Sequence, residues 1–114
     1  LNGEKTGYAY SENTDMPDIR IGNLFISRSN YIVKVNDVKV EMPPKEIELL
    51  YYLAKNPMRV FTREQLLEKV WGEEYKGDSR TVDVHIKRIR EKLGLGTNWS
   101  LVTVWSVGYK FEVV

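Results

Sequence analysis

One stretch of fifteen residues, from Ser79 to Leu93, constrains the fold of this chain most strongly. Branched aliphatic side chains recur there at the i, i+4, i+7 and i+11 spacing of one helix face, namely at Val82, Ile86, Ile89 and Leu93. The opposite face is mostly charged and comprises Arg80, Val84, Lys87, Arg88 and Glu91, with Asp83 and Arg90 on one flank. Such a helix is stable when its apolar face packs on a core, so the chain is predicted to fold against it.

The basic excess of the chain is concentrated in this helix. Its basic residues outnumber its acidic ones by five to two, whereas the whole chain has a net charge of only +1. At 1.5 Å per residue the helix is about 20 Å long. A helix with an anchored back and a cationic front fits the major groove of DNA. The same pattern also describes a solvated helix face, in which Asp83 is placed to pair with Lys87 at i+4.

Composition excludes several classes of protein. The 114 residues suffice for one domain with a modest core. No apolar run of transmembrane length occurs in the sequence, and because its first residues lack the charged and apolar regions of a signal peptide, none is expected. The absence of cysteine excludes disulfides and thiol nucleophiles and fits the cytoplasm. Because His85 is the only histidine, no metal site and no cofactor are expected. The chain begins with Leu1 rather than Met, and we expect it to be a piece of a longer protein.

The first third of the chain predicts a linker followed by a sheet. Residues 1–17 are polar and have little periodicity, which is typical of a linker or tail; a strand through residues 8–10 is the alternative. Four short alternating segments follow, at residues 19–21, 24–27, 31–35 and 38–41. The turn at Asn36-Asp37 suits a hairpin because both residues tolerate positive φ. These segments predict an antiparallel meander that needs a helical layer on one face.

Two further helices are predicted before the basic one. The first begins near Pro44, which suits the first helical position. The second follows a short strand at residues 60–61 and a capping box formed by Thr62 and Gln65. It ends at Gly72, and it is predicted to bury Leu66, Leu67, Val70 and Trp71.

The end of the chain predicts a hairpin. Ser79 is expected to cap the basic helix, and Gly94 and Gly96 to end it. Alternating segments at residues 101–105 and 109–113 then flank a tight turn. The element order is therefore ββββ-α-β-α-α-ββ, an α+β fold. Two helices joined by a loop and followed by a hairpin form a winged helix, a variant of the helix-turn-helix.

Several strings of residues carry a family resemblance. They are Pro44-Lys-Glu-Ile-Glu-Leu-Leu50, Thr62-Arg-Glu-Gln-Leu-Leu67, Val70-Trp-Gly72, Arg80-Thr-Val-Asp-Val-His-Ile86 with Arg88 and Arg90, and Val107-Gly-Tyr109. In this order they resemble the OmpR/PhoB-type effector domain of bacterial two-component response regulators, over residues 18–114. The resemblance implies a non-enzymatic, DNA-binding transcription factor. It also implies an upstream receiver domain that a sensor kinase phosphorylates, with residues 1–17 as the end of the linker to it.

The resemblance also implies roles for individual residues. Base contacts are implied for Asp83, Val84 and Arg88. Phosphate contacts are implied for Arg80, Thr81, His85, Lys87, Arg90 and Thr103. Chemistry agrees at two positions, because Arg88 can donate twice to guanine and Val84 can touch a thymine methyl. Family members commonly bind tandem direct repeats as head-to-tail pairs. In some activators the loop corresponding to residues 73–78 touches RNA polymerase, which makes Glu73, Glu74 and Tyr75 candidates.

Two positions depart from the family pattern. In the hairpin, Trp105 stands where some members insert an arginine into the minor groove, and Ser106 follows where glycine is usual. A tryptophan cannot replace a guanidinium in a narrow, negative groove. At the start of the first helix, Pro43 stands where threonine usually caps, which predicts a small loss of stability.

Alternatives remain at this stage. His85 is read either as a packed ring or as a donor to phosphate, and Trp105 either as packing within the wing or as a stacking surface. Trp71 and Tyr109 are read as core residues. For the whole chain, a winged helix that binds only protein is one rival. A small hydrolase is the other, but the sequence offers no set of nucleophile, base and orienting group.

Overall fold

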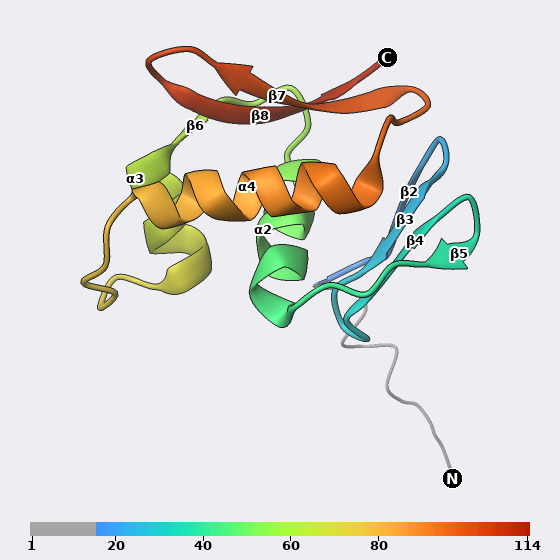
Figure 1. The fold of residues 1–114 in the computed structure, drawn as a ribbon, viewed down its shortest axis with the longest axis horizontal. Coiled ribbons are helices and arrows are strands. Elements are labelled where there is room, and N and C mark those ends of the chain that lie inside the picture. Colours follow the sequence, from blue (N-terminus) through green and yellow to red (C-terminus); the bar gives the residue numbers. More distant parts are fainter. Residues whose placement is uncertain (1–15) are drawn as a thin grey trace, which may run out of the picture.

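The computed structural model describes residues 16–114, in which helices connect two antiparallel sheets (Figure 1). The predicted linker lies outside the described residues except for Met16 and Pro17, and so does the alternative strand at residues 8–10. The order of elements is the predicted one, which confirms the winged helix-turn-helix fold. Among residues 16–114, no helix combines the length and apolarity needed to cross a bilayer.

The N-terminal sheet is the predicted four-stranded meander. Its strands are β2 (Ile19–Ile21), β3 (Leu24–Ser27), β4 (Ile32–Val35) and β5 (Val38–Lys39), paired in that order. The hairpin turn is confirmed, with φ values of 52° at Asn36 and 65° at Asp37. Strand β4 begins one residue later than predicted because Tyr31 has a φ of 54° and belongs to the turn. Strand β5 ends earlier than predicted, although Val40 still donates to the Val33 carbonyl at 2.8 Å.

Helix α2 (Pro44–Lys55) begins at the predicted proline and lies under the basic helix. Pro43 provides no side-chain cap, as its residue type requires. Its carbonyl instead accepts the amides of Glu46 at 3.0 Å and Ile47 at 3.2 Å. The helix face predicted to be buried is buried, at Ile47, Leu50, Tyr51 and Ala54.

The second predicted helix is divided. It comprises α3 (Arg63–Leu66) and a π-helical turn, η1 (Leu67–Trp71). The capping box of Thr62 and Gln65 is present, and Gly72 ends the segment with a φ of 104°. Only Leu66 is fully buried; Leu67, Val70 and Trp71 are half-buried, so that part of the prediction was too strong. The wider π-turn changes the direction of each side chain, which 3.6-residue periodicity does not anticipate.

The C-terminal sheet has the order β6-β8-β7. It contains β6 (Phe61–Thr62), β7 (Trp99–Val104) and β8 (Gly108–Val113). Strand β6 lies one residue later than predicted, because Phe61 and Thr62 pair with Tyr109 and Gly108. Strand β7 begins two residues before the predicted start and stops at Val104, which leaves Trp105 in the turn of the hairpin.

Helix α4 (Arg80–Leu93) crosses the molecule between these layers (Figure 1). Its predicted apolar face is buried throughout, at Val82, Ile86, Ile89 and Leu93. Gly94 ends the helix with a φ of 70°. Beyond it, the Asn23 side chain accepts from the Thr97 amide at 3.1 Å and from the Trp99 indole at 2.7 Å. These two hydrogen bonds connect the N-terminal sheet to the loop that follows α4.

Candidate nucleic-acid interface

The outward face of α4 carries few free charges. Arg80, Val84, Lys87, Arg88 and Glu91 are all exposed, as predicted. Within residues 16–114, neither Lys87 nor Arg88 takes part in an ion pair or a side-chain hydrogen bond, and both point to solvent beside Val84. The pair of Asp83 with Lys87, which would support the alternative of a solvated helix face, does not form because Asp83 accepts from Arg63 and Tyr109. Two cations and an exposed methyl-bearing side chain therefore form the free centre of this face.

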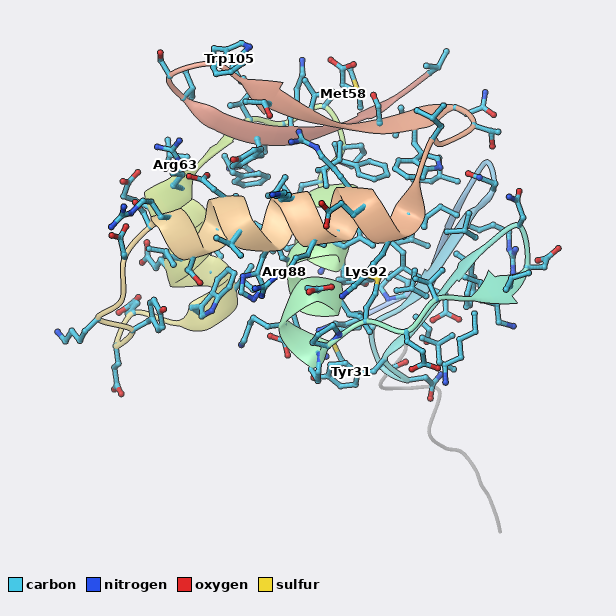
Figure 2. The ribbon with its side chains drawn as sticks, viewed as in Figure 1. Tyr31, Met58, Arg63, Arg88, Lys92 and Trp105 are labelled. Carbon is cyan, nitrogen blue, oxygen red and sulfur yellow. The ribbon has the colours of Figure 1, made fainter. Side chains whose placement is uncertain are left out.

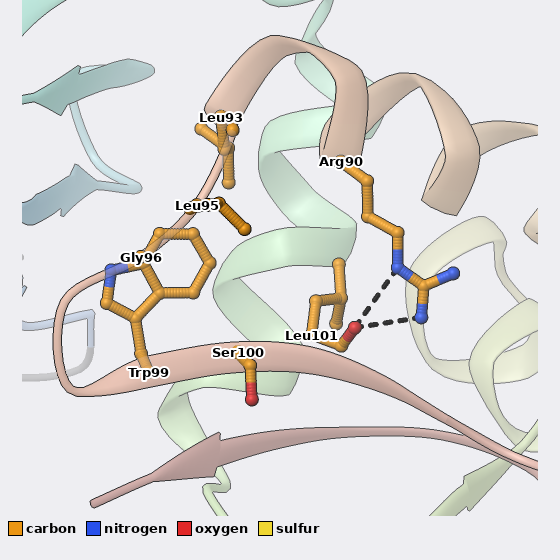
Figure 3. A pocket seen from close by; sticks show the side chains of 8 residues that line it. Arg90, Leu93, Leu95, Gly96, Trp99, Ser100 and Leu101 are labelled. Carbon is orange, nitrogen blue, oxygen red and sulfur yellow. Dashed lines mark hydrogen bonds between the residues drawn. The ribbon is translucent and has the colours of Figure 1, made fainter.

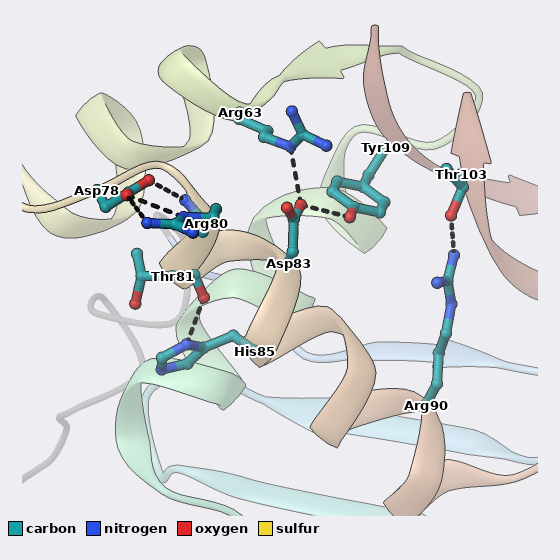
Figure 4. Close-up of polar contacts among 9 residues, drawn as sticks. All are labelled: Arg63, Asp78, Arg80, Thr81, Asp83, His85, Arg90, Thr103 and Tyr109. Atoms are coloured by element: carbon teal, nitrogen blue, oxygen red, sulfur yellow. Dashed lines mark hydrogen bonds and ion pairs between the residues drawn. The ribbon is translucent and has the colours of Figure 1, made fainter. Parts of the chain in front are cut away.

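Asp83 joins three elements at one carboxylate oxygen (Figure 4). Its Oδ1 accepts from Arg63 Nε at 2.8 Å and from the Tyr109 hydroxyl at 2.6 Å. Burial, and then the hydrogen bond to Asp83, raise the pKa of Tyr109 above its usual range. The hydrogen bond to Asp83 is also the main cause that raises the pKa of Arg63. We call Arg63, Asp83 and Tyr109 the hinge cluster, since it links α3, α4 and β8.

Arg90 and Thr103, two predicted phosphate contacts, meet each other. Arg90 donates to the Leu101 carbonyl from Nε at 3.1 Å and from Nη2 at 2.8 Å. Its Nη2 also lies 2.9 Å from the Thr103 hydroxyl. The guanidinium lies 5.7 Å from the centre of the Tyr109 ring. Arg90 therefore holds the hairpin against α4.

The cap of α4 differs from the prediction. Ser79 has φ −64° and ψ −16°, which are already helical, and its side chain makes no capping bond. Asp78 does this instead, because its Oδ1 accepts the Arg80 amide at 2.8 Å. Its Oδ2 accepts from Arg80 Nε at 2.9 Å and Nη2 at 2.8 Å. These bonds from Arg80 lower the pKa of Asp78.

His85 is packed as well as hydrogen-bonded. Its Nδ1 lies 2.8 Å from the Thr81 carbonyl, to which it donates. The ring meets Trp71 edge-on, with centroids 4.9 Å apart. The Lys45 ammonium lies over the Trp71 ring, 5.9 Å from the ring centre. Trp71 is half-buried rather than a full core residue, whereas Tyr109 is buried as predicted.

Sequence reasoning does not predict the structural roles of two side chains. Lys92 is one of the five basic residues of the helix, but its Nζ lies 2.6 Å from Oε1 of the buried Glu46. Arg63 was considered only as part of a capping box, although it supports Asp83. Both partners lie far away in sequence, and no local pattern indicates such pairings.

The hairpin ends in an exposed tip at residues 105–107, which we call the wing tip. Ser106 has a φ of 67°, and the Val107 amide donates to the Val104 carbonyl at 3.0 Å. A cavity of about 210 Å³ separates the wing tip from the hinge cluster and is lined by both. The two predicted wing residues, Trp105 and Ser106, therefore lie next to the N-terminal half of α4.

A second cavity lies at the other end of α4 (Figure 3). It has a volume of about 360 Å³, and its walls are mainly the apolar side chains of Leu93, Leu95, Trp99 and Leu101. Within residues 16–114, no group of three or more potential metal ligands is gathered. The loop before α4 exposes Glu73, Glu74 and Tyr75, and the Tyr75 ring lies 6.3 Å from that of Trp71.

Comparisons with known proteins agree with this geometry. Residues 37–111 match the family described as transcriptional regulatory protein, C terminal. An uncharacterized transcriptional regulatory protein of Bacillus subtilis, YclJ, is 56% identical over 88 residues, which cover 76% of this chain and 39% of that protein. The chain spans less than half the length of the curated relatives it matches.

Two solved structures share the fold. The response regulator DrrB of Thermotoga maritima, an OmpR/PhoB homolog, superposes with a TM-score of 0.77 at 30% identity, over 97% of this chain and 56% of that one. The DNA-binding domain of RstA from Klebsiella pneumoniae, solved in complex with the RstA box, gives a TM-score of 0.71 at 30% identity. That match covers 84% of this chain and 97% of that one.

Proposed function

The chain belongs to the OmpR/PhoB-type family of C-terminal DNA-binding domains of transcriptional regulators, and we propose that it reads double-stranded DNA by placing α4 in the major groove. The observation that carries this proposal is the free centre of α4, where Lys87 and Arg88 are exposed and unpaired among residues 16–114. Because the opposite face of α4 is buried in the core, this is the face that the helix can present to DNA.

Base recognition is assigned to three side chains. Arg88 is free to donate to the O6 and N7 of a guanine, and the exposed Val84 supplies an apolar contact for a thymine methyl. Asp83 uses Oδ1 for the hinge cluster, so its Oδ2 is the atom that would accept from a cytosine amino group. The hinge cluster fixes this carboxylate, which supports a single register on the bases.

Phosphate contacts are assigned to side chains around that centre. Lys87 supplies a free charge, and Arg80 remains exposed despite its bonds to Asp78. Thr81, His85, Arg90 and Thr103 complete the set. Because Arg90 and Thr103 already bond each other, we infer that they hold the hairpin in place and present their remaining donors to one phosphate. Such contacts position the domain, whereas base contacts specify the sequence.

The test is selection of bound sites from random double-stranded DNA, followed by binding measurements at fixed salt. We expect a selected site to bind at least about a thousandfold more tightly than scrambled DNA. Equal affinities would contradict sequence-specific recognition and would favour a winged helix that binds protein. Incubation with nucleotide and ester substrates is the matching test for catalysis, and no turnover is expected.

The longer protein is also part of the proposal. We infer that a receiver domain phosphorylated by a sensor kinase precedes this domain, that residues 1–17 connect the two, and that the protein acts in the cytoplasm without a cofactor. Glu73, Glu74 and Tyr75 are exposed together and would suit a basic surface of RNA polymerase. A reporter assay tests that contact: replacement of Glu73 and Tyr75 by alanine should reduce activation while DNA binding stays intact.

A further inference from the structure

The two acidic residues of α4 have opposite environments. The Asp83 carboxylate is held by Arg63 and Tyr109. Glu91 is exposed and, within residues 16–114, takes part in no ion pair and no side-chain hydrogen bond. Lys87 stands four residues before it, but a lysine that precedes a glutamate at this spacing is the weaker orientation for a pair. Among the described residues, Glu91 is therefore a free negative charge on a mostly cationic face.

Helical geometry places Glu91 at the centre of that face. At about 100° per residue, Glu91 lies within about 20° of Val84 around the helix axis, and Val84 is exposed. Contacts mark the two edges of the face, because Arg90 bonds the hairpin on one side and Lys92 forms its ion pair on the other. Figure 2 shows Arg88 and Lys92 along the edge of α4 that is away from the hairpin. Glu91 points away from the core between these edges, where a bound major groove would present its bases.

A carboxylate at this position discriminates among the four bases. It only accepts hydrogen bonds. In the major groove guanine presents the acceptors O6 and N7, and thymine presents the acceptor O4. Adenine presents its N6 amino donor beside the acceptor N7, whereas cytosine presents only the N4 amino donor. Cytosine is therefore the base that a free carboxylate matches best.

We propose that Glu91 is a specificity-determining residue that accepts a hydrogen bond from the N4 amino group of a cytosine. This inference rests on the proposed function, because it requires α4 to lie in the major groove. Glu91 follows Arg88 by three residues, which is about 4.5 Å along the helix, and successive base pairs are about 3.4 Å apart. The cytosine should therefore lie about one or two base pairs from the guanine assigned to Arg88. On other sequences the same carboxylate lowers affinity, because it repels phosphates.

The experiment selects sites from random double-stranded DNA with the parent chain, Glu91→Ala and Glu91→Gln in parallel. The parent should favour cytosine over guanine and thymine at one position by roughly tenfold. Glu91→Ala should abolish that preference and keep the preference assigned to Arg88. Glu91→Gln should change the preferred base to adenine, because a glutamine amide bonds adenine N6 and N7 together. A structural role or a general charge effect would not exchange one base for another.

Affinities for four duplexes that differ only at this base pair, and for scrambled DNA, complete the test. Glu91→Ala should bind scrambled DNA more tightly than the parent, because a charge that repels phosphates is gone. The matched control is Glu41→Gln, which removes the same charge from a side chain that is 87% exposed after β5. It should leave every base preference unchanged. Because Glu41 and Glu91 are both exposed, all variants should unfold at the temperature of the parent chain.

Two outcomes overturn the inference while the proposed function stands. One is an equal gain in affinity for all four duplexes and for scrambled DNA with Glu91→Ala, which would leave Glu91 with phosphate repulsion alone. The other is retention of cytosine by Glu91→Gln at the position that the parent selects, which would assign that base to another residue. If the parent chain does not distinguish its selected duplex from scrambled DNA, the proposed function fails first and the inference fails with it.

Discussion

At the scale of single residues, we propose that neighbouring side chains on α4 have different roles. Arg88 would read a base, whereas Lys87 would supply a point charge to a phosphate. We expect Arg88→Ala to weaken binding to the selected site by about 1–3 kcal/mol and to change affinity for random DNA much less. Lys87→Ala should weaken both to the same extent. Fluorescence anisotropy on both duplexes at one salt concentration measures this, and equal losses for Arg88→Ala would remove its base-reading role.

Lys92 illustrates a charge with a structural role. Its ammonium is the partner of Glu46, whose side chain is almost fully buried. Loss of the partner leaves a buried carboxylate uncompensated, so Lys92→Met should lower the free energy of unfolding by about 2–3 kcal/mol. The control is Lys69→Met, at an exposed lysine that has no ion pair with the described residues. Urea unfolding compares them, and equal midpoints for the two variants would contradict the role of the pair.

At the scale of elements, the hinge cluster couples α3, α4 and β8. Tyr109→Phe removes the hydrogen bond to the Asp83 carboxylate and should cost about 1.5–3 kcal/mol at neutral pH. Burial and this bond raise the pKa of Tyr109. A raised pKa means that its stabilisation is complete below the unfolded pKa of about 10 and is lost as pH rises through the higher folded value. Urea midpoints between pH 7 and pH 11 should therefore fall less steeply at the alkaline end for Tyr109→Phe.

The matched variant for this prediction is Tyr75→Phe. Tyr75 is exposed and lies on the loop before α4, outside the hinge cluster. Its replacement should leave both the midpoint at pH 7 and the alkaline slope close to those of the parent chain. The same alkaline slope in the parent and in Tyr109→Phe would show that the pKa of this tyrosine does not differ between the folded and unfolded protein.

The sequence predicted an element correctly where the residues that determine it lie close together in the chain. The buried stripe of α4, the Thr62–Gln65 capping box and the Asn36-Asp37 turn each depend on residues within a few positions. Errors arose where distant groups compete. In the alternative of a solvated face Asp83 would pair with Lys87 one turn away, but Arg63 and Tyr109 reach it from other elements. The hairpin was predicted, but its turn was placed at residues 106–108 and lies at residues 105–107. The exposure of Trp105 depends on how the hairpin leaves the core.

At the scale of the whole molecule, the surface predicts the state of association. Large apolar side chains that remain exposed are spread over separate elements, as with Tyr31 before β4, Leu95 after α4 and Trp105 in the wing tip. A stable dimer needs a continuous buried interface of about 1,200–2,000 Å², which this dispersal does not provide. The net charge of +1 adds little repulsion, so the lack of a continuous apolar surface on residues 16–114 favours a monomer.

We therefore expect the free chain to be a monomer that pairs on DNA carrying two direct repeats of the selected site. Sedimentation velocity should give one monomeric species without DNA. It should give a two-to-one complex on a duplex with two repeats and a one-to-one complex on a duplex with one. The control is a two-repeat duplex lengthened by half a helical turn, which places the second major groove on the opposite side. Equal cooperativity on both spacings would contradict contact between the paired domains, and a tight dimer without DNA would contradict the argument from the surface.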